Sequence, residues 1–227
     1  MGRGETERGQ QRLVEGERRV QVRDAQVDVA ERAQVDDATC GMDGIPTPTL
    51  VVVSGPPGSG KTTLAHALAA EIHCPAVCRD EIKEGMVHAA GGEFQGGHGD
   101  ELTARTFPLF FGVVRTLLAG AVTVVAEAAF QDHRWRPQLE PLRELARVRI
   151  VRCRVDPAVA FERAVGRAEA STVRLQAHGD STAGGLEQWT KAFASFEHIS
   201  IDAPTLDVDT TDGYAPGLDA IASFVNA

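Results

Sequence analysis

A continuous apolar run followed by a glycine-rich turn is the feature that most limits how this chain can fold. The run is Leu-Val-Val-Val at residues 50–53, a composition expected of a strand buried on both faces of a parallel sheet. The turn is Gly55-Pro56-Pro57-Gly58-Ser59-Gly60-Lys61-Thr62, which matches the pattern G-x-x-x-x-G-K-[ST] completely. Helical apolar spacing follows directly, at Leu64, Leu68 and Ile72. This strand–turn–helix order predicts an α/β protein.

The glycine-rich turn, residues 55–62, is hereafter called the phosphate loop because its composition suits phosphate binding. Its glycines let the backbone curl so that several N–H groups point inward, and the following helix adds partial positive charge. Lys61 can reach the β- and γ-phosphates of a nucleoside triphosphate, and the Thr62 hydroxyl can ligate Mg²⁺. We therefore expect ATP and Mg²⁺ as cofactors. The expected nucleotide-binding residues are Gly55, Pro56, Pro57, Gly58, Ser59, Gly60, Lys61, Thr62 and Thr63.

Strand-like and helix-like segments alternate along the rest of the chain. Further strands are expected near residues 75–78, 122–126, 148–155 and 205–208. Helices are expected at residues 61–72, 80–89, 103–118, 137–146, 156–167, 182–196 and 216–225. This alternation predicts a three-layer sandwich around a mainly parallel five-stranded sheet. Together with the phosphate loop, it indicates the P-loop nucleoside triphosphate hydrolase fold of the nucleotide-kinase type.

The first 44 residues differ in composition from the remainder. They are rich in Arg, Glu, Gln and Gly, and their apolar residues are mostly isolated valines that supply no packed face. We expect a disordered or marginally structured N-terminal extension over residues 1–44. Met42 is a candidate start, and a dispensable tail is the alternative interpretation. Residues 45–227 form the expected catalytic domain, with a lid around residues 163–182.

Charge and cysteine content narrow the class of protein. Acidic residues outnumber basic ones by 32 to 23, a formal net charge of −9, which disfavours a general binder of nucleic acid or anionic membrane. No apolar run approaches the roughly 18–20 residues of a membrane helix. Four cysteines without an apolar signal region favour a reduced, cytoplasmic protein. For Cys74, Cys78 and the neighbouring His73 we expect core packing rather than a metal site.

A charged segment follows the second expected strand. In open α/β sheets ligands bind beyond the carboxyl ends of the strands, so Asp80 faces the same crevice as the phosphate loop. Its carboxylate could accept a proton from a substrate hydroxyl, although a plain helix cap explains an aspartate there equally well. Arg79 or Lys83 could hold the acceptor or the transition-state charge.

From residue 50 to residue 225 the chain resembles small P-loop kinases of the polynucleotide-kinase and chloramphenicol-phosphotransferase type, an AAA-like ATP-binding family. The zeta-toxin kinases share this layout. Arg79-Asp80-x-x-Lys83 is similar to the Arg-Asp-x-x-Arg segment of phage polynucleotide kinase, where the Asp is the general base and the Arg contacts the acceptor phosphate. The resemblance implies that Asp80 is the base. Lys83 lacks the bidentate fork of the arginine it replaces.

Three further positions take expected roles from this resemblance. Glu127 ends the third strand, where relatives usually have Asp, which implies a carboxylate near the metal or substrate. Arg163 and Arg167 lie where relatives supply lid arginines to the γ-phosphate, and their spacing puts them on one helix face. We expect Arg167 to act first, then Arg163, with Arg174 following in the chain. Thr210 belongs to a segment that in relatives leads to the loop beside the adenine, and a strand end with a turn explains it equally well.

The leading interpretation is an ATP-dependent kinase that moves the γ-phosphoryl group of ATP to a hydroxyl of a small molecule. One alternative is a polynucleotide 5′-hydroxyl kinase, which the segment around Asp80 favours and the acidic charge disfavours. The other is a nucleotide-binding regulator or toxin-like protein. Acceptor sites in this fold lie near the glycine-rich loop at residues 91–99, where His98 is a possible acid or base and more typical of a solvated side chain. Oligomeric state stays open.

Overall fold

The computed structural model describes residues 47–91, 101–179 and 181–227. The chain divides into two units, Met1–Asp43 and Gly44–Ala227, and every helix and strand described below belongs to the second. The expected N-terminal extension and the loop with His98 lie outside the described residues.

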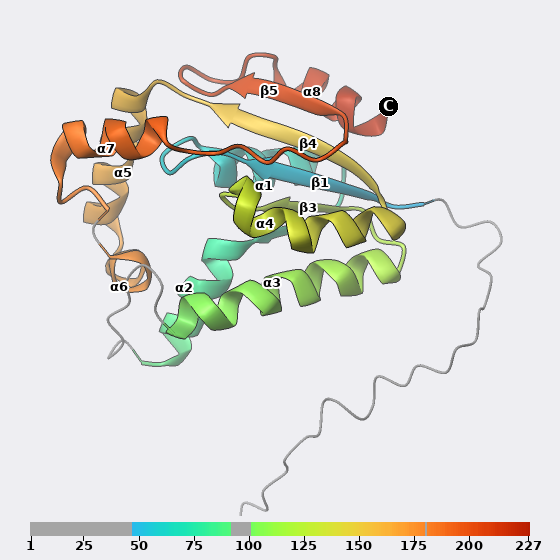
Figure 1. Ribbon diagram of the computed structural model, residues 1–227, viewed down its shortest axis with the longest axis horizontal. Helices are drawn as coiled ribbons and strands as arrows, with labels where there is room; N and C mark the ends of the chain where they lie inside the picture. Colours follow the sequence, from blue (N-terminus) through green and yellow to red (C-terminus); the bar gives the residue numbers. More distant parts are fainter. Residues whose placement is uncertain (1–46, 92–100, 180) are drawn as a thin grey trace, which may run out of the picture. The chain divides into compact units, whose positions relative to one another are not determined.

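A five-stranded, wholly parallel sheet forms the centre of the second unit (Figure 1). Its strands are β1 (Thr49–Ser54), β2 (Ala76–Cys78), β3 (Val124–Glu127), β4 (Arg147–Arg154) and β5 (Thr205–Asp209), in the order β2-β3-β1-β4-β5. All six residues of β1 are buried, as its apolar composition predicts for a central strand. The predicted fold class is confirmed. The order brings the carboxyl ends of β1, β2 and β3 to one edge of the sheet.

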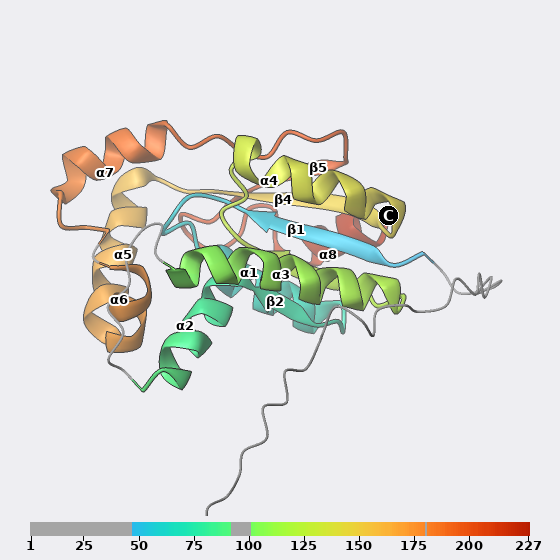
Figure 2. The ribbon, with the colours of Figure 1, turned by 60° about the horizontal axis from the view of Figure 1, so that its bottom comes forward.

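Helices cover both faces of the sheet and extend beyond its carboxyl edge. They are α1 (Lys61–Glu71), α2 (Arg79–Ala89), α3 (Glu101–Ala119), α4 (Asp132–Leu139), α5 (Pro157–Ala170), α6 (Thr172–His178), α7 (Gly185–Ala194) and α8 (Leu218–Asn226). A 3₁₀ helix, η1 (Glu140–Glu144), continues α4. The helices α5, α6 and α7 lie beyond the strand tips, at the left of Figures 1 and 2.

The alternation of β1 divides the core into two layers. Val51 and Val53 pack with Leu64 and Leu68 of α1 and with Ile221 of α8. Leu50 and Val52 point to the other face, where α3 and α4 supply the contacts. An aromatic cluster fills that layer, formed by Phe107, Phe110, Phe111, Phe130 and Trp135. Opposite faces of one strand thus bury two helix layers, which is the expected three-layer sandwich.

Three local expectations are wrong in detail. The third strand begins at Val124, two residues late, because Ala121 has a φ of 57° and turns the chain before the sheet. The helix expected at residues 137–146 begins at Asp132, whose carboxylate accepts hydrogen bonds from Arg136 one turn later and from the Ser200 amide. Asp80 is not a helix cap, because α2 begins at Arg79.

The helix α3, the longest of the described helices, is the one among them to compare with a membrane span. By length and composition it could cross a membrane, with a mean hydropathy of 1.2, and 39% of its apolar window is buried. Its buried residues pack against the sheet and α2, which accounts for the composition as that of a core helix. They are Leu102, Thr103, Thr106, Phe110, Phe111, Val114 and Leu118.

Candidate active site

The phosphate loop owes its curl to two glycines in the left-handed region. Gly58 has a φ of 80° and Gly60 a φ of 73°, and a Cβ on Gly58 would overlap the backbone of Ala160 in α5. Gly60 occupies the N-cap position of α1, so the loop runs directly into the helix N-terminus. The buried hydroxyl of Ser59 has no hydrogen-bond partner among the described residues. These features form a cradle that fits a nucleotide phosphate.

Thr210 supports the phosphate loop through a contact between its side chain and the loop backbone. Its hydroxyl is within hydrogen-bond distance of two backbone carbonyls, 2.7 Å from Ser59 and 2.9 Å from Arg154, and the side chain is buried. The resemblance implies a place for Thr210 beside the nucleotide, and a strand end with a turn explains the residue equally well. In the structure its side chain lies against the loop backbone. Thr63, also expected at the nucleotide, is exposed on the first turn of α1.

A buried carboxylate lies beneath the loop, at the end of β3. Glu127 is 1% exposed, accepts a hydrogen bond from the Thr62 hydroxyl at 3.2 Å, and lies 3.8 Å from Lys61 Nζ. Burial raises the pKa of Glu127, the Lys61 charge opposes that rise, and the Asp80 charge adds to it. Its Oε1 has no hydrogen-bond partner in the described part of the chain. A buried carboxylate oxygen without a hydrogen bond, near a threonine hydroxyl, is a donor set that suits Mg²⁺.

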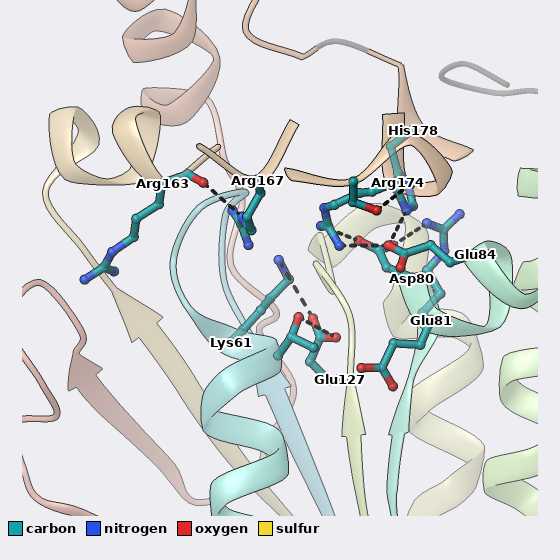
Figure 3. A network of polar contacts seen from close by, with 12 residues as sticks. Lys61, Asp80, Glu81, Glu84, Glu127, Arg163, Arg167, Arg174 and His178 are labelled. Carbon is teal, nitrogen blue, oxygen red and sulfur yellow. Dashed lines mark hydrogen bonds and ion pairs between the residues drawn. The ribbon is translucent and has the colours of Figure 1, made fainter. Parts of the chain in front are cut away.

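Asp80 lies across the crevice from Lys61, on the first turn of α2 (Figure 3). Arg79 donates a hydrogen bond to its Oδ1 at 2.8 Å, and Arg174 of α6 lies 3.9 Å from its Oδ2. Burial alone would raise the pKa of Asp80, but the charges of His178, Lys61 and Arg79 lower it to about 2. The carboxylate is therefore ionised at neutral pH.

The two expected lid arginines point in different directions (Figure 3). Arg167 points toward Lys61, and its Nε donates to the Arg163 carbonyl at 3.1 Å. Burial lowers the pKa of Arg167, and the Arg174 charge lowers it further. Arg163 points away and donates to the carbonyls of Thr210 and Thr211, both at 2.9 Å. Only Arg167 of this pair borders the cavity described next.

A cavity of about 280 Å³ joins these groups. Lys61, Asp80, Arg79, Lys83, Arg134, Arg167, Arg174 and His178 border it, together with Phe107, Trp135 and Phe196. Lys83, expected to contact substrate, is 1% exposed and donates to Thr103 in α3 at 2.8 Å. The structure places it in the wall of the cavity, between α2 and α3.

The sequence analysis does not identify Arg134 and His178, which border the cavity, or Glu84, which contacts two of the lining residues. Glu84 accepts a hydrogen bond from Arg174 at 2.8 Å and contacts His178 at 3.3 Å, which attaches α6 to α2. Arg134 stacks over Phe107, with 5.7 Å between its guanidinium carbon and the ring centroid. The four-residue spacing of Arg174 and His178 indicates a shared helix face, and nothing in it indicates the partner helix.

The fold and site define a class of protein, the P-loop nucleoside triphosphate-binding α/β proteins. The model of the AAA domain family matches residues 50–198, and the chain belongs to that family. No curated protein matches the chain.

Solved structures extend the likeness to about four fifths of the chain. A candidate kinase from Chloroflexus aurantiacus is 24% identical, with a TM-score of 0.69, covering 80% of this chain and 98% of that one. Chaetomium thermophilum Kti12, solved with ADP-AlF3, is 19% identical, with a TM-score of 0.55 and coverages of 78% and 99%. The Mycobacterium tuberculosis APS kinase CysC, solved with AMPPNP and APS, is 14% identical, with a TM-score of 0.52 and coverages of 80% and 99%. At these identities the likeness concerns the fold, which is that of P-loop kinases.

Proposed function

We propose that this protein is an ATP-dependent phosphotransferase that moves the γ-phosphoryl group to a hydroxyl of a small molecule. The observation that carries the proposal is that Lys61, Asp80 and Arg167 border one cavity at the mouth of the phosphate loop. A phosphate in the loop and an acceptor hydroxyl in the cavity would meet between the ammonium group of Lys61 and the ionised carboxylate of Asp80.

The nucleotide end would work through the loop backbone, Lys61, Thr62 and Glu127. Lys61 would contact the β- and γ-phosphates, and Thr62 with Glu127 would hold Mg²⁺. The ion held there would supply positive charge that offsets the charge of the phosphate oxygens. Arg167 points toward Lys61 and is placed to stabilise the charge that spreads over the transferred group.

Asp80 would orient the acceptor hydroxyl and take its proton. A pKa of about 2 makes it a weak base, so the proton moves to it only as the hydroxyl oxygen bonds to phosphorus. In a loose phosphoryl-transfer transition state the nucleophile needs little activation and much positioning. The contact with Arg79 and the nearby Arg174 hold the carboxylate in place.

The basic lining of the cavity favours an acceptor with a negatively charged group. Arg79, Lys83, Arg134 and Arg174 border the cavity, and Asp80 is the one carboxylate among its lining residues in the described part of the chain. Phe107 and Phe196 add apolar surface that suits a ring or a flat apolar segment.

ADP release with Mg·ATP, alone and with a panel of hydroxyl acceptors, tests the proposal. We expect an acceptor-dependent rise that falls about 10²- to 10⁴-fold in Asp80→Asn, with ATP affinity within a few-fold of the wild type. Asp219→Asn, at an exposed position on α8, is the control for loss of an aspartate charge and should transfer normally. Normal transfer by Asp80→Asn would contradict the assignment. Clear ATP binding with no rise in ADP release for any acceptor would favour a nucleotide-gated regulator.

A second acceptor class is favoured by the stacking of Arg134 on Phe107. An arginine beside aromatic rings can contact a phosphate while the rings stack on a base. A 5′-hydroxyl oligonucleotide therefore belongs in the panel. If it is the acceptor, its affinity should fall steeply with salt.

A further inference from the structure

Outside the cavity, three metal-ligating side chains from three elements converge at the start of α2. His66 lies on α1, Cys78 ends β2 and Glu81 lies on α2. Their ligand atoms all lie within 4.8 Å of one another. His66 Nε2 is 2.7 Å from Glu81 Oε1 and 3.7 Å from Cys78 Sγ. Cys74 and His73, which the sequence put beside Cys78, are not members of this cluster.

We propose that His66, Cys78 and Glu81 bind a thiophilic divalent cation, zinc by preference, with a fourth position open to water. Thiolate, imidazole and carboxylate together are a zinc donor set, whereas Mg²⁺ prefers oxygen alone. Around a tetrahedral zinc with usual bond lengths, a sulfur and a nitrogen ligand stand about 3.6 Å apart. The observed distance of 3.7 Å between Cys78 Sγ and His66 Nε2 is close to this separation. The distance of 2.7 Å between His66 and Glu81 would lengthen on binding, since nitrogen and oxygen ligands of zinc stand about 3.3 Å apart.

Exposure leaves the cluster accessible to an ion. Cys78 is 3% exposed, whereas the side chains of His66 and Glu81 are 51% and 48% exposed, so an ion can enter past them. Burial raises the pKa of the Cys78 thiol, and the carboxylates of Glu127 and Glu81 raise it further, so a bound ion must displace the thiol proton.

The three ligands do not line the cavity, although Cys78 pairs with Glu127 in the sheet and interacts with its carboxylate. Glu81 points away from Asp80 and from the arginines (Figure 3). Asp80 nevertheless lies between Cys78 and Glu81 in sequence, and His66 is one helical turn from Thr62 on α1. A bound ion would therefore join the phosphate-loop helix to the first turn of α2. It would hold the segment that carries Asp80 in a fixed position relative to the loop.

Titration of the reduced full chain with Co²⁺, without nucleotide, tests the site. We expect one equivalent to bind, with visible bands of a tetrahedral ion and a near-ultraviolet thiolate-to-cobalt band that stoichiometric Zn²⁺ abolishes. His66→Gln and Glu81→Gln alter exposed side chains, and each should weaken binding at least tenfold. Zn²⁺ should raise the Tm of the wild type more than that of His66→Gln.

Matched controls separate this site from general binding by cysteine and histidine. Cys74→Ser, His88→Gln and Glu71→Gln change the same residue types nearby and should leave the cobalt spectrum and affinity unchanged. The proposal is overturned if saturating Co²⁺ gives no thiolate band. It is also overturned if the band persists with equal affinity in both His66→Gln and Glu81→Gln, or disappears in Cys74→Ser. None of these outcomes depends on phosphotransfer.

Discussion

The two ends of the cavity are built in different ways. At the proposed nucleotide end, consecutive residues 55–62 form the loop through backbone conformation, with Gly58 and Gly60 at positive φ. At the proposed acceptor end, side chains come from α2, α3, α4, α5 and α6, and contacting residues such as Glu84 and His178 are 94 positions apart. The structure of the first end depends on the backbone conformations that a short segment can adopt. The structure of the second end depends on how the helices pack against one another. Local sequence therefore specifies the phosphate site far more completely than the acceptor.

Arg167 and Arg163 give the clearest test of how helix packing shapes the cavity. Both lie on α5, but only Arg167 borders the cavity. Arg167→Ala should lower kcat about a thousandfold, because its guanidinium is placed to reach the transferred phosphoryl group. Arg163→Ala should leave kcat within about tenfold and lower thermal stability, because it removes hydrogen bonds to the carbonyls of Thr210 and Thr211. Steady-state kinetics and melting curves on both variants measure the difference. Equal losses of kcat would mean that the direction of the side chains does not matter.

A substitution at Gly58 tests the close contact between the phosphate loop and α5. Gly58→Ala should destabilise the protein by about 2 kcal/mol and weaken ATP binding, because it combines a left-handed φ with overlap against the backbone of Ala160. Denaturant unfolding and nucleotide titration measure the two effects. Gly85→Ala is the matched control, since its Cβ meets nothing within 4 Å and the glycine lies inside α2. The control should be neutral or stabilising. A stable Gly58→Ala with normal ATP affinity would contradict the close approach of α5 to the loop.

The same contrast explains which parts of the molecule could be predicted from the sequence. The phosphate loop, the parallel sheet and most helices follow from local signals, namely glycine positions, β-branched runs and 3.6-residue spacing. The divergence of Arg163 and Arg167 does not follow, because a shared helix face fixes the Cα positions and leaves several side-chain torsions free. Nor does the attachment of α6 to α2 through Glu84, which depends on tertiary packing between segments with no local signal of their partner.

Substitution of Glu127 gives the smallest expected change in stability. Glu127 comes from β3, far from the phosphate loop in sequence, so it tests the part of the proposed nucleotide site that local sequence does not specify. Burial raises its pKa, so the folded protein disfavours the charged carboxylate. The wild type should lose stability as pH rises from about 4.5 toward that raised pKa, whereas Glu127→Gln should not. Near neutral pH the variant should be more stable by about 1 kcal/mol and should turn over Mg·ATP more slowly. Melting curves from pH 4 to 8 measure the divergence. A variant that melts below the wild type at neutral pH would mean that the contact with Lys61 outweighs the cost of burying the charge.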